Sequence, residues 1–250
     1  MALIDYQTAL GRLIRARSID GDGSTQRQWQ DLALSHQERE LLDSLLAGRG
    51  LDFTRDVQRS WCKGRARNTA YLTLSILAEK QRQALLDAWV GSGGGVASFS
   101  AGEAERLLDF IALRLPPHSH AFSLCRMEQA VHRANAALAS GPVFGGRATD
   151  GMLGRDAAAS MVEFFAEPNL LLHAVQSNAP LPPLSSSPVS IFFSPLLPGL
   201  FRHADPAEAA LWHRLQQPAD AAVLQSECAD VNLAATIETL LQHGILAAHA

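Results

Sequence analysis

The sequence has few charged residues and few cysteines. Charged side chains make up 18% of the 250 residues, and the formal net charge is -4. Proteins that bind nucleic-acid phosphates normally gather Lys and Arg on one face, so this balance argues against such a surface. Cys62, Cys125 and Cys228 lie far apart with no paired spacing, which fits free thiols in a reducing compartment.

Long apolar runs are also lacking. No stretch of about 18 consecutive apolar residues occurs, and the first residues show no charged leader followed by a continuous apolar core. We therefore expect a cytoplasmic protein. Hydrophobic residues nevertheless make up 47% of the chain, which is enough for a folded protein with a sizeable core.

Helix signals dominate the first 140 residues. Ser35 with Glu38, and Ser100 with Glu103, have the spacing of a capping box, in which the two side chains satisfy backbone N–H groups at the start of a helix. Gly48 is expected to end the first of these helices. The sequence therefore predicts at least two capped helices in this region.

Two further helices follow from apolar periodicity. One long helix is predicted over residues 66–90 and another over 119–139, where apolar residues recur at steps of three and four. The second helix has a polar face, which carries Arg126, Glu128, His132 and Arg133. We expect this face to be solvated or to contact a partner.

The regular helical periodicity of the sequence ends at a glycine-rich segment at 141–154, and shorter mixed elements follow. Residues 155–168 predict a helix, and the leucine run that follows could be a strand. Two short apolar runs around a Pro-Gly turn then predict a hairpin. The chain closes with three predicted helices, at 206–216, 219–227 and 232–244.

These elements predict a mainly α fold with a small β hairpin, of the α+β class. We expect a helical domain over 1–140, a connecting segment over 141–187, and a winged-helix-like peptide-recognition domain over 188–250.

Candidate catalytic groups are few. His118 and His120 have a spacing that could chelate a metal, but no third ligand is nearby, and a helix start is the simpler interpretation.

Lys63 could lower the thiol pKa of Cys62, although one neighbour is weak support for a nucleophile. Glu163 and Glu167 could share a helix face and a metal ion, but solvated surface carboxylates are the simpler interpretation. We assign no catalytic residue and no metal ligand, and keep a metal enzyme built on the His118/His120 pair as a remote alternative.

Two segments resemble known proteins. The hairpin, the three helices and the closing LLQHGIL resemble the leader-recognition elements of enzymes that modify ribosomally made peptides. The segment SLCRMEQAVHRANAAL resembles the mid-chain helix of the partner proteins of multinuclear non-haem iron oxidative enzymes. About half of the chain takes part in this likeness. The family's Tyr-Arg-Asn-Asn motif is missing, with GRARNTAY as its nearest counterpart, which points to the methanobactin-biosynthesis (MbnC-type) branch.

The resemblance implies a role without a catalytic residue. Such proteins pair as heterodimers with a TIM-barrel multinuclear iron enzyme, which holds the iron, so no cofactor is expected in this chain. The methanobactin pair uses dioxygen to oxidise precursor-peptide cysteines to oxazolone and thioamide groups. The resemblance thus implies a non-catalytic subunit that binds the leader of the precursor peptide.

The hairpin is the expected docking site, because an exposed strand edge can accept an extended peptide as another strand. Ile191 and Phe193 point to one side of the strand and Phe192 to the other, so one set could face the peptide unless all three are core. The candidate peptide-binding residues are Ser190, Ile191, Phe192, Phe193, Ser194, Ile237, Leu240 and Leu241.

For the partner enzyme we expect an interface on the polar side of the 119–139 helix, at Arg126, His132 and Arg133, where these side chains could pair with acidic groups. A DNA-binding regulator that uses the same winged-helix unit is the main alternative, although the last predicted helix lacks basic residues to meet phosphates.

Overall fold

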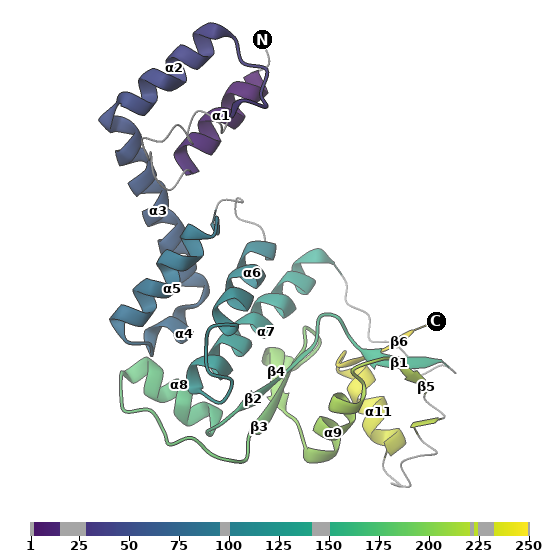
Figure 1. Cartoon of the computed structure of the whole chain (residues 1–250). Helices are drawn as coiled ribbons and strands as arrows, with labels where there is room; N and C mark the ends of the chain where they lie inside the picture. Colours follow the sequence, from purple (N-terminus) through teal and green to yellow (C-terminus); the bar gives the residue numbers. More distant parts are fainter. Residues whose placement is uncertain are drawn as a thin grey trace. The chain divides into compact units, whose positions relative to one another are not determined.

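A computed structural model describes residues 3–15, 29–95, 101–141, 151–220, 223–224 and 233–249. The chain forms two compact units (Figure 1). The first unit comprises residues 1–68 and 79–99, and the second comprises residues 69–78 and 100–250. Within the described ranges, no helix combines the length and the apolar character needed to cross a membrane.

The first unit is helical. Its helices are α1 (Leu3–Arg15), α2 (His36–Ala47), α3 (Arg49–Thr69, of which the last residue belongs to the second unit) and α5 (Glu79–Gly91). The capping box of α2 is confirmed, since the Ser35 N–H donates to Glu38 Oε2 at 2.8 Å, and α2 ends before Gly48 as expected. Buried Arg55 donates from Nε and Nη2 to the Leu13 carbonyl near the end of α1, so it joins α3 to α1.

The second unit combines helices with two small sheets. The helices are α4 (Tyr71–Ser75), α6 (Ala101–Ala112), α7 (His120–Ser140), α8 (Pro168–Ser177), the 3-10 turn η2 (Pro198–Leu200), α9 (Pro206–Arg214) and α11 (Leu233–Gln242). The strands are β1 (Met152–Arg155), β2 (Ser160–Phe164), β3 (Val189–Phe193), β4 (Phe201–His203), β5 (Ala219–Asp220) and β6 (Leu246–His249). The α+β class is confirmed.

Both sheets are antiparallel and have three strands, in the orders β5-β1-β6 and β2-β3-β4. The middle strand β3 separates two apolar cores. Ile191 and Phe193 pack with side chains from α7 and α8, whereas Phe192 packs with side chains from α9, α11 and β6. The β2-β3-β4 sheet therefore has helices against both faces (Figure 1).

Four of the predicted elements differ from the structure. The single helix expected over 66–90 is divided among α3, α4 and α5. Residues 155–168, expected to be a helix, contain the end of β1 and all of β2, and the leucine run expected to be a strand forms α8. The predicted helix at 219–227 begins as strand β5, and the residues after it are described only at 223–224. Ser100 of the second capping box lies outside the described residues.

The compact units divide at other positions than the boundaries expected at 140/141 and 187/188. Leu124, Met127 and Ala130 of α7 share one core with Val162 and Phe164 of β2. This burial joins α7 to the sheets of the second unit, because apolar side chains in one core are stabilised together.

Candidate functional site

Strand β3, expected to be the docking edge, is paired on both sides. On one side, Ile191 of β3 lies opposite Val162 of β2. On the other side, Phe192 of β3 lies opposite Arg202 of β4. A central strand has no free row of N–H and C=O groups for an incoming peptide. The expectation that residues 190–194 form the free edge is therefore corrected: β3 is the centre of its sheet.

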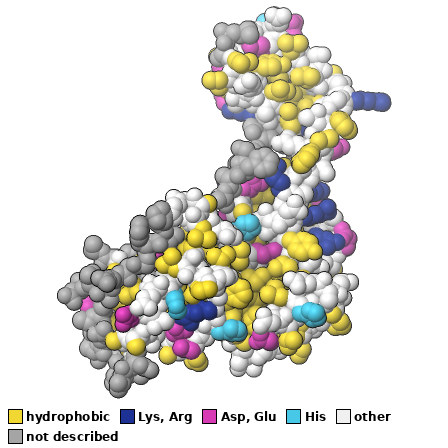
Figure 2. All heavy atoms as spheres, turned by 180° about the vertical axis from the view of Figure 1, so that it is seen from behind, with side chains coloured by type: hydrophobic (Ala, Val, Ile, Leu, Met, Phe, Trp, Pro, Cys, Tyr) yellow, Lys and Arg dark blue, Asp and Glu magenta, His cyan; other side chains and the backbone are white. Residues whose placement is uncertain are grey.

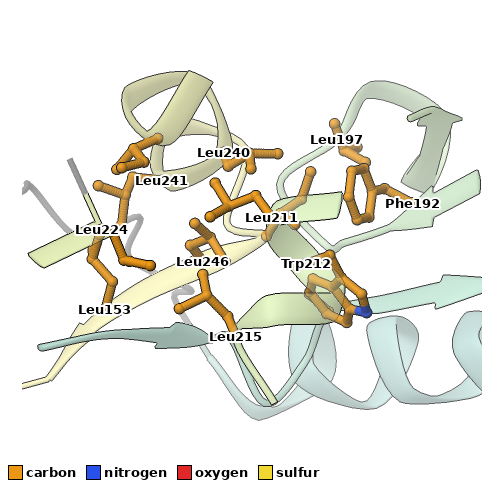
Figure 3. Close-up of a cluster of buried hydrophobic side chains, with 13 residues drawn as sticks. Leu153, Phe192, Leu197, Leu211, Trp212, Leu215, Leu224, Leu240, Leu241 and Leu246 are labelled. Atoms are coloured by element: carbon orange, nitrogen blue, oxygen red, sulfur yellow. The ribbon is translucent and has the colours of Figure 1, made fainter. Parts of the chain in front are cut away.

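The apolar side chains predicted to bind the peptide are core residues. Phe192, Ile237, Leu240 and Leu241 are at most 3% exposed and share one apolar cluster (Figure 3). The Phe192 ring meets the Trp212 ring edge to face, with centroids 5.5 Å apart. Ile191 and Phe193 fill the core on the other face of the sheet. Packed side chains of the described residues therefore occupy the space between this strand and α11.

Buried Ser194 ties the end of β3 to the turn after α11. Its Oγ donates to the His243 carbonyl at 2.7 Å and accepts from the Leu196 N–H. Gly244 in that turn has a φ of 59°, and a Cβ there would lie 2.8 Å from Leu196 Cδ1. The turn requires glycine for both reasons, and it returns Ile245 and Leu246 to the core.

The free edge of the hairpin belongs to β4. The Ala204 N–H donates to the Ser190 carbonyl, and the Ser194 N–H donates to the Leu200 carbonyl. Bonded and non-bonded residue pairs alternate in an antiparallel ladder, so Phe201 and His203 direct their N–H and C=O groups away from β3. In the part of the chain that the structure describes, no strand pairs with this outer edge.

Two features favour this edge as a binding surface. The Phe201 side chain is 53% exposed beside the open backbone groups, with its ring centroid 5.9 Å from that of Phe193. On the opposite edge of the sheet, the Ser123 hydroxyl already donates to the Glu163 carbonyl of β2. The outer edge of β4 thus offers the outward N–H groups of Phe201 and His203, the Phe201 carbonyl and an apolar side chain, whereas the His203 carbonyl already accepts from Arg202 Nη1 at 2.8 Å.

An ion pair fixes β4 to α9. Arg202 donates from Nη1 and Nη2 to the two carboxylate oxygens of buried Glu208, at 2.7 and 2.6 Å. Burial alone would raise the pKa of Glu208, but the bonds from Arg202 and from the Asp205 N–H hold this pKa below its ordinary value. The edge strand is therefore attached to a capped helix.

A second candidate site is an open polar hollow of about 430 Å³. We call it the arginine hollow, because Arg126 and Arg133 of α7 line it together with Arg155 at the end of β1. Asp109, Gln129, Asp156, Ser160 and Trp212 are among its other lining residues. Arg126 and Arg133 were expected from the sequence to face a partner.

Both expected arginines already have partners within the chain. Arg126 donates to the Gln129 side-chain oxygen at 2.7 Å and lies 3.6 Å from Asp109 Oδ1. Arg133 pairs with Glu105 at 2.7 Å and donates to Ser160 Oγ at 3.1 Å. These contacts hold both side chains in place.

Arg155 was missed by sequence reasoning, which placed it at the start of a helix. Its Nε and Nη2 donate to the Trp212 carbonyl at 2.9 and 2.6 Å, and its guanidinium lies 4.6 Å from the Trp212 ring centroid. No local signal predicts this contact, because the two residues are 57 positions apart.

The remaining candidates are not assembled into one site. His132 of the expected interface lies outside the arginine hollow, with Nε2 3.4 Å from the Thr69 carbonyl. Glu128, expected on the polar face, is buried and accepts bonds from α4. His120 contacts the Pro182 carbonyl, whereas His118 contacts the Phe165 ring.

The candidate thiols and carboxylates are also separated. Cys62 is buried against the Gly95 carbonyl, and its neighbour Lys63 pairs with Asp87. Glu163 lies in a strand, so it does not share a helix face with Glu167. Among the described residues, no group of three or more His, Cys, Asp or Glu side chains could hold a metal ion.

The sequence matches no known protein family, and no curated protein is significantly similar to it.

Proposed function

We propose that this chain is a non-catalytic subunit that binds the leader of a ribosomally made precursor peptide. It would present the peptide's cysteines to an iron-dependent TIM-barrel oxygenase that makes oxazolone and thioamide groups, as in methanobactin-type biosynthesis. The iron would belong to the partner enzyme in a heterodimer. The likeness of the 123–138 segment to partner proteins of such enzymes supports this role.

The observation that carries the proposal is the outer edge of β4. No strand among the described residues pairs with its Phe201 and His203 N–H groups or with the Phe201 C=O, and the His203 C=O accepts from Arg202 Nη1. An extended peptide that adds to such an edge gains affinity from main-chain hydrogen bonds and specificity from alternate side chains. The exposed Phe201 ring offers an apolar contact for the peptide.

The order of elements also favours a winged-helix-like recognition unit. After the β3-β4 hairpin, the chain continues through α9, β5, α11 and β6, and β1 pairs between β5 and β6. The main alternative, a DNA-binding regulator, would need basic residues on α11 to meet phosphates. Leu233–Gln242 contains no Lys or Arg, and basic and acidic side chains are interspersed on the face shown in Figure 2.

We expect a proline at His203 to weaken leader binding by about 10-fold, because it removes one outward N–H and a main-chain hydrogen bond contributes about 0.5–1.5 kcal/mol. His203→Ala keeps this N–H and should change the affinity by less than about 2-fold. The probe is a fluorescein-labelled leader of a methanobactin-type precursor peptide, and its binding is measured by fluorescence anisotropy.

Circular dichroism serves as the folding control for both variants. Proline is tolerated in edge strands when its position does not donate to the ladder, so both proteins should fold. Equal leader affinities for the proline and alanine variants would contradict docking at β4.

A further inference from the structure

The arginine hollow offers a binding site that the leader-binding proposal does not use. We propose that it binds a carboxylate group, supplied by an acidic side chain of a protein partner, and that Arg155 makes the direct contact. The identification of the donor as a partner protein rests on the proposed function. Carboxylate recognition itself rests only on the side chains of the hollow.

Arg155 is oriented by its contacts with Trp212. A guanidinium has five N–H donors, and the two bonds to the Trp212 carbonyl occupy one each on Nε and Nη2. Three donors remain, two of them on Nη1. The Trp212 ring lies against the guanidinium and restrains its plane, so the remaining donors form a fixed fork of the kind that matches a carboxylate.

Arg155 also differs from the other two arginines in having no acidic partner. Arg126 lies beside Asp109, and Arg133 pairs with Glu105, whereas no carboxylate of the described residues forms an ion pair with Arg155. The adjacent Asp156 accepts a bond from the Ala158 N–H instead. Burial without a compensating acid lowers the pKa of Arg155. An incoming carboxylate would supply the acidic partner that this guanidinium does not have among the described residues.

The charges around the hollow favour a singly charged ligand. Asp109 and Asp156 line it, and Glu105 lies beside Arg133, so three carboxylates accompany the three guanidinium groups. A phosphate dianion would meet these acids, whereas one carboxylate needs only the Arg155 fork. The volume of about 430 Å³ exceeds what one carboxylate fills, which fits a side chain that enters with its own peptide segment.

The test uses the full chain and N-acetyl-glutamate methylamide as a probe. Because Trp212 lies against Arg155, its indole N–H resonance in nitrogen-15 NMR spectra reports on the hollow, and Trp212→Phe assigns that resonance. We expect a saturable shift with the probe, a much weaker one with N-acetyl-glutamine methylamide, and weaker binding of methyl phosphate than of the carboxylate.

Variants identify the contact. Arg155→Gln should weaken probe binding by about 10-fold or more, and Arg155→Lys, which keeps the charge and loses the fork, by less. The matched control is Arg114→Gln, since Arg114 lies over the Phe110 ring and donates to the Phe110 carbonyl outside the hollow. It should bind the probe as the unaltered chain does.

Equal binding of the glutamine probe, tighter binding of methyl phosphate, or unchanged affinity in Arg155→Gln would overturn the proposal. His203→Pro should leave this titration unchanged, so failure of the leader-binding proposal and failure of this one give different results.

Discussion

Replacing Phe192 by alanine is expected to lower the free energy of unfolding by about 3–5 kcal/mol. Phe192 is 0% exposed in the middle strand of its sheet and meets Trp212 edge to face. Truncation removes its apolar contacts and leaves a cavity between the sheet and α9, which the fixed β3 pairing prevents from closing. Urea unfolding followed by circular dichroism measures the loss.

The matched control is Phe201→Ala, which removes the same side chain from the neighbouring strand. Phe201 is 53% exposed, so its loss should cost less than about 1 kcal/mol. A Phe192→Ala protein as stable as Phe201→Ala would contradict the placement of Phe192 in the core, and with it the central position of β3.

Glu128→Gln is expected to lower the free energy of unfolding by about 2–4 kcal/mol. Glu128 Oε1 accepts from the Leu72 N–H at 2.7 Å, and Oε2 accepts from Thr73 Oγ1 at 2.6 Å. A glutamine offers one oxygen and one NH₂ group. Either the Leu72 N–H or the Thr73 donors would then face this NH₂ group instead of an acceptor. Glu105→Gln, which breaks the exposed pair with Arg133, should cost less than about 1 kcal/mol.

The pH dependence of stability provides a second readout for Glu128. Burial raises its pKa above the ordinary value of 4.5, and the hydrogen bonds offset only part of this shift. The folded state then binds the proton more tightly than the unfolded state does, so this residue's contribution to stability falls as the pH rises above 4.5. Glu128→Gln should lack this component, and an identical pH dependence in both proteins would contradict it.

Local signals in the sequence predicted several helix ends correctly. Ser35 and Glu38 form their capping box, and Gly48 follows the end of α2. These motifs work within a few residues and depend little on the rest of the fold. The hairpin at β3 and β4 was predicted for the same reason, because Pro198 and Gly199 mark the turn between two apolar runs.

The break between α3 and α4 could not be predicted locally. Ala70 precedes α4 and has no capping side chain, while Glu128 accepts the N–H groups of Leu72 and Thr73 in the first turn of α4. The cap comes from a residue about 55 positions away, so the 66–90 window shows only a continuous helical period. Tertiary contacts of this kind override local propensity.

The errors at 155–177 have a different cause. Short apolar runs do not distinguish a strand from a helix by periodicity alone. A signal for α8 was present, since Glu167 caps the helix and Pro168 occupies its first position. For the candidate sites, the sequence identified two arginines of the hollow. It missed Arg155 and the role of β4, because both depend on which segments the fold places side by side.

Amide hydrogen exchange tests the central claim most directly, namely that a peptide adds to the outer edge of β4. The Phe201 and His203 N–H groups point away from β3, as does that of Met161 on the opposite edge of the sheet. When the leader peptide is added, we expect exchange to slow by at least about 10-fold at Phe201 or His203 and to stay unchanged at Met161. Unchanged exchange at both β4 residues with the leader bound would contradict the account.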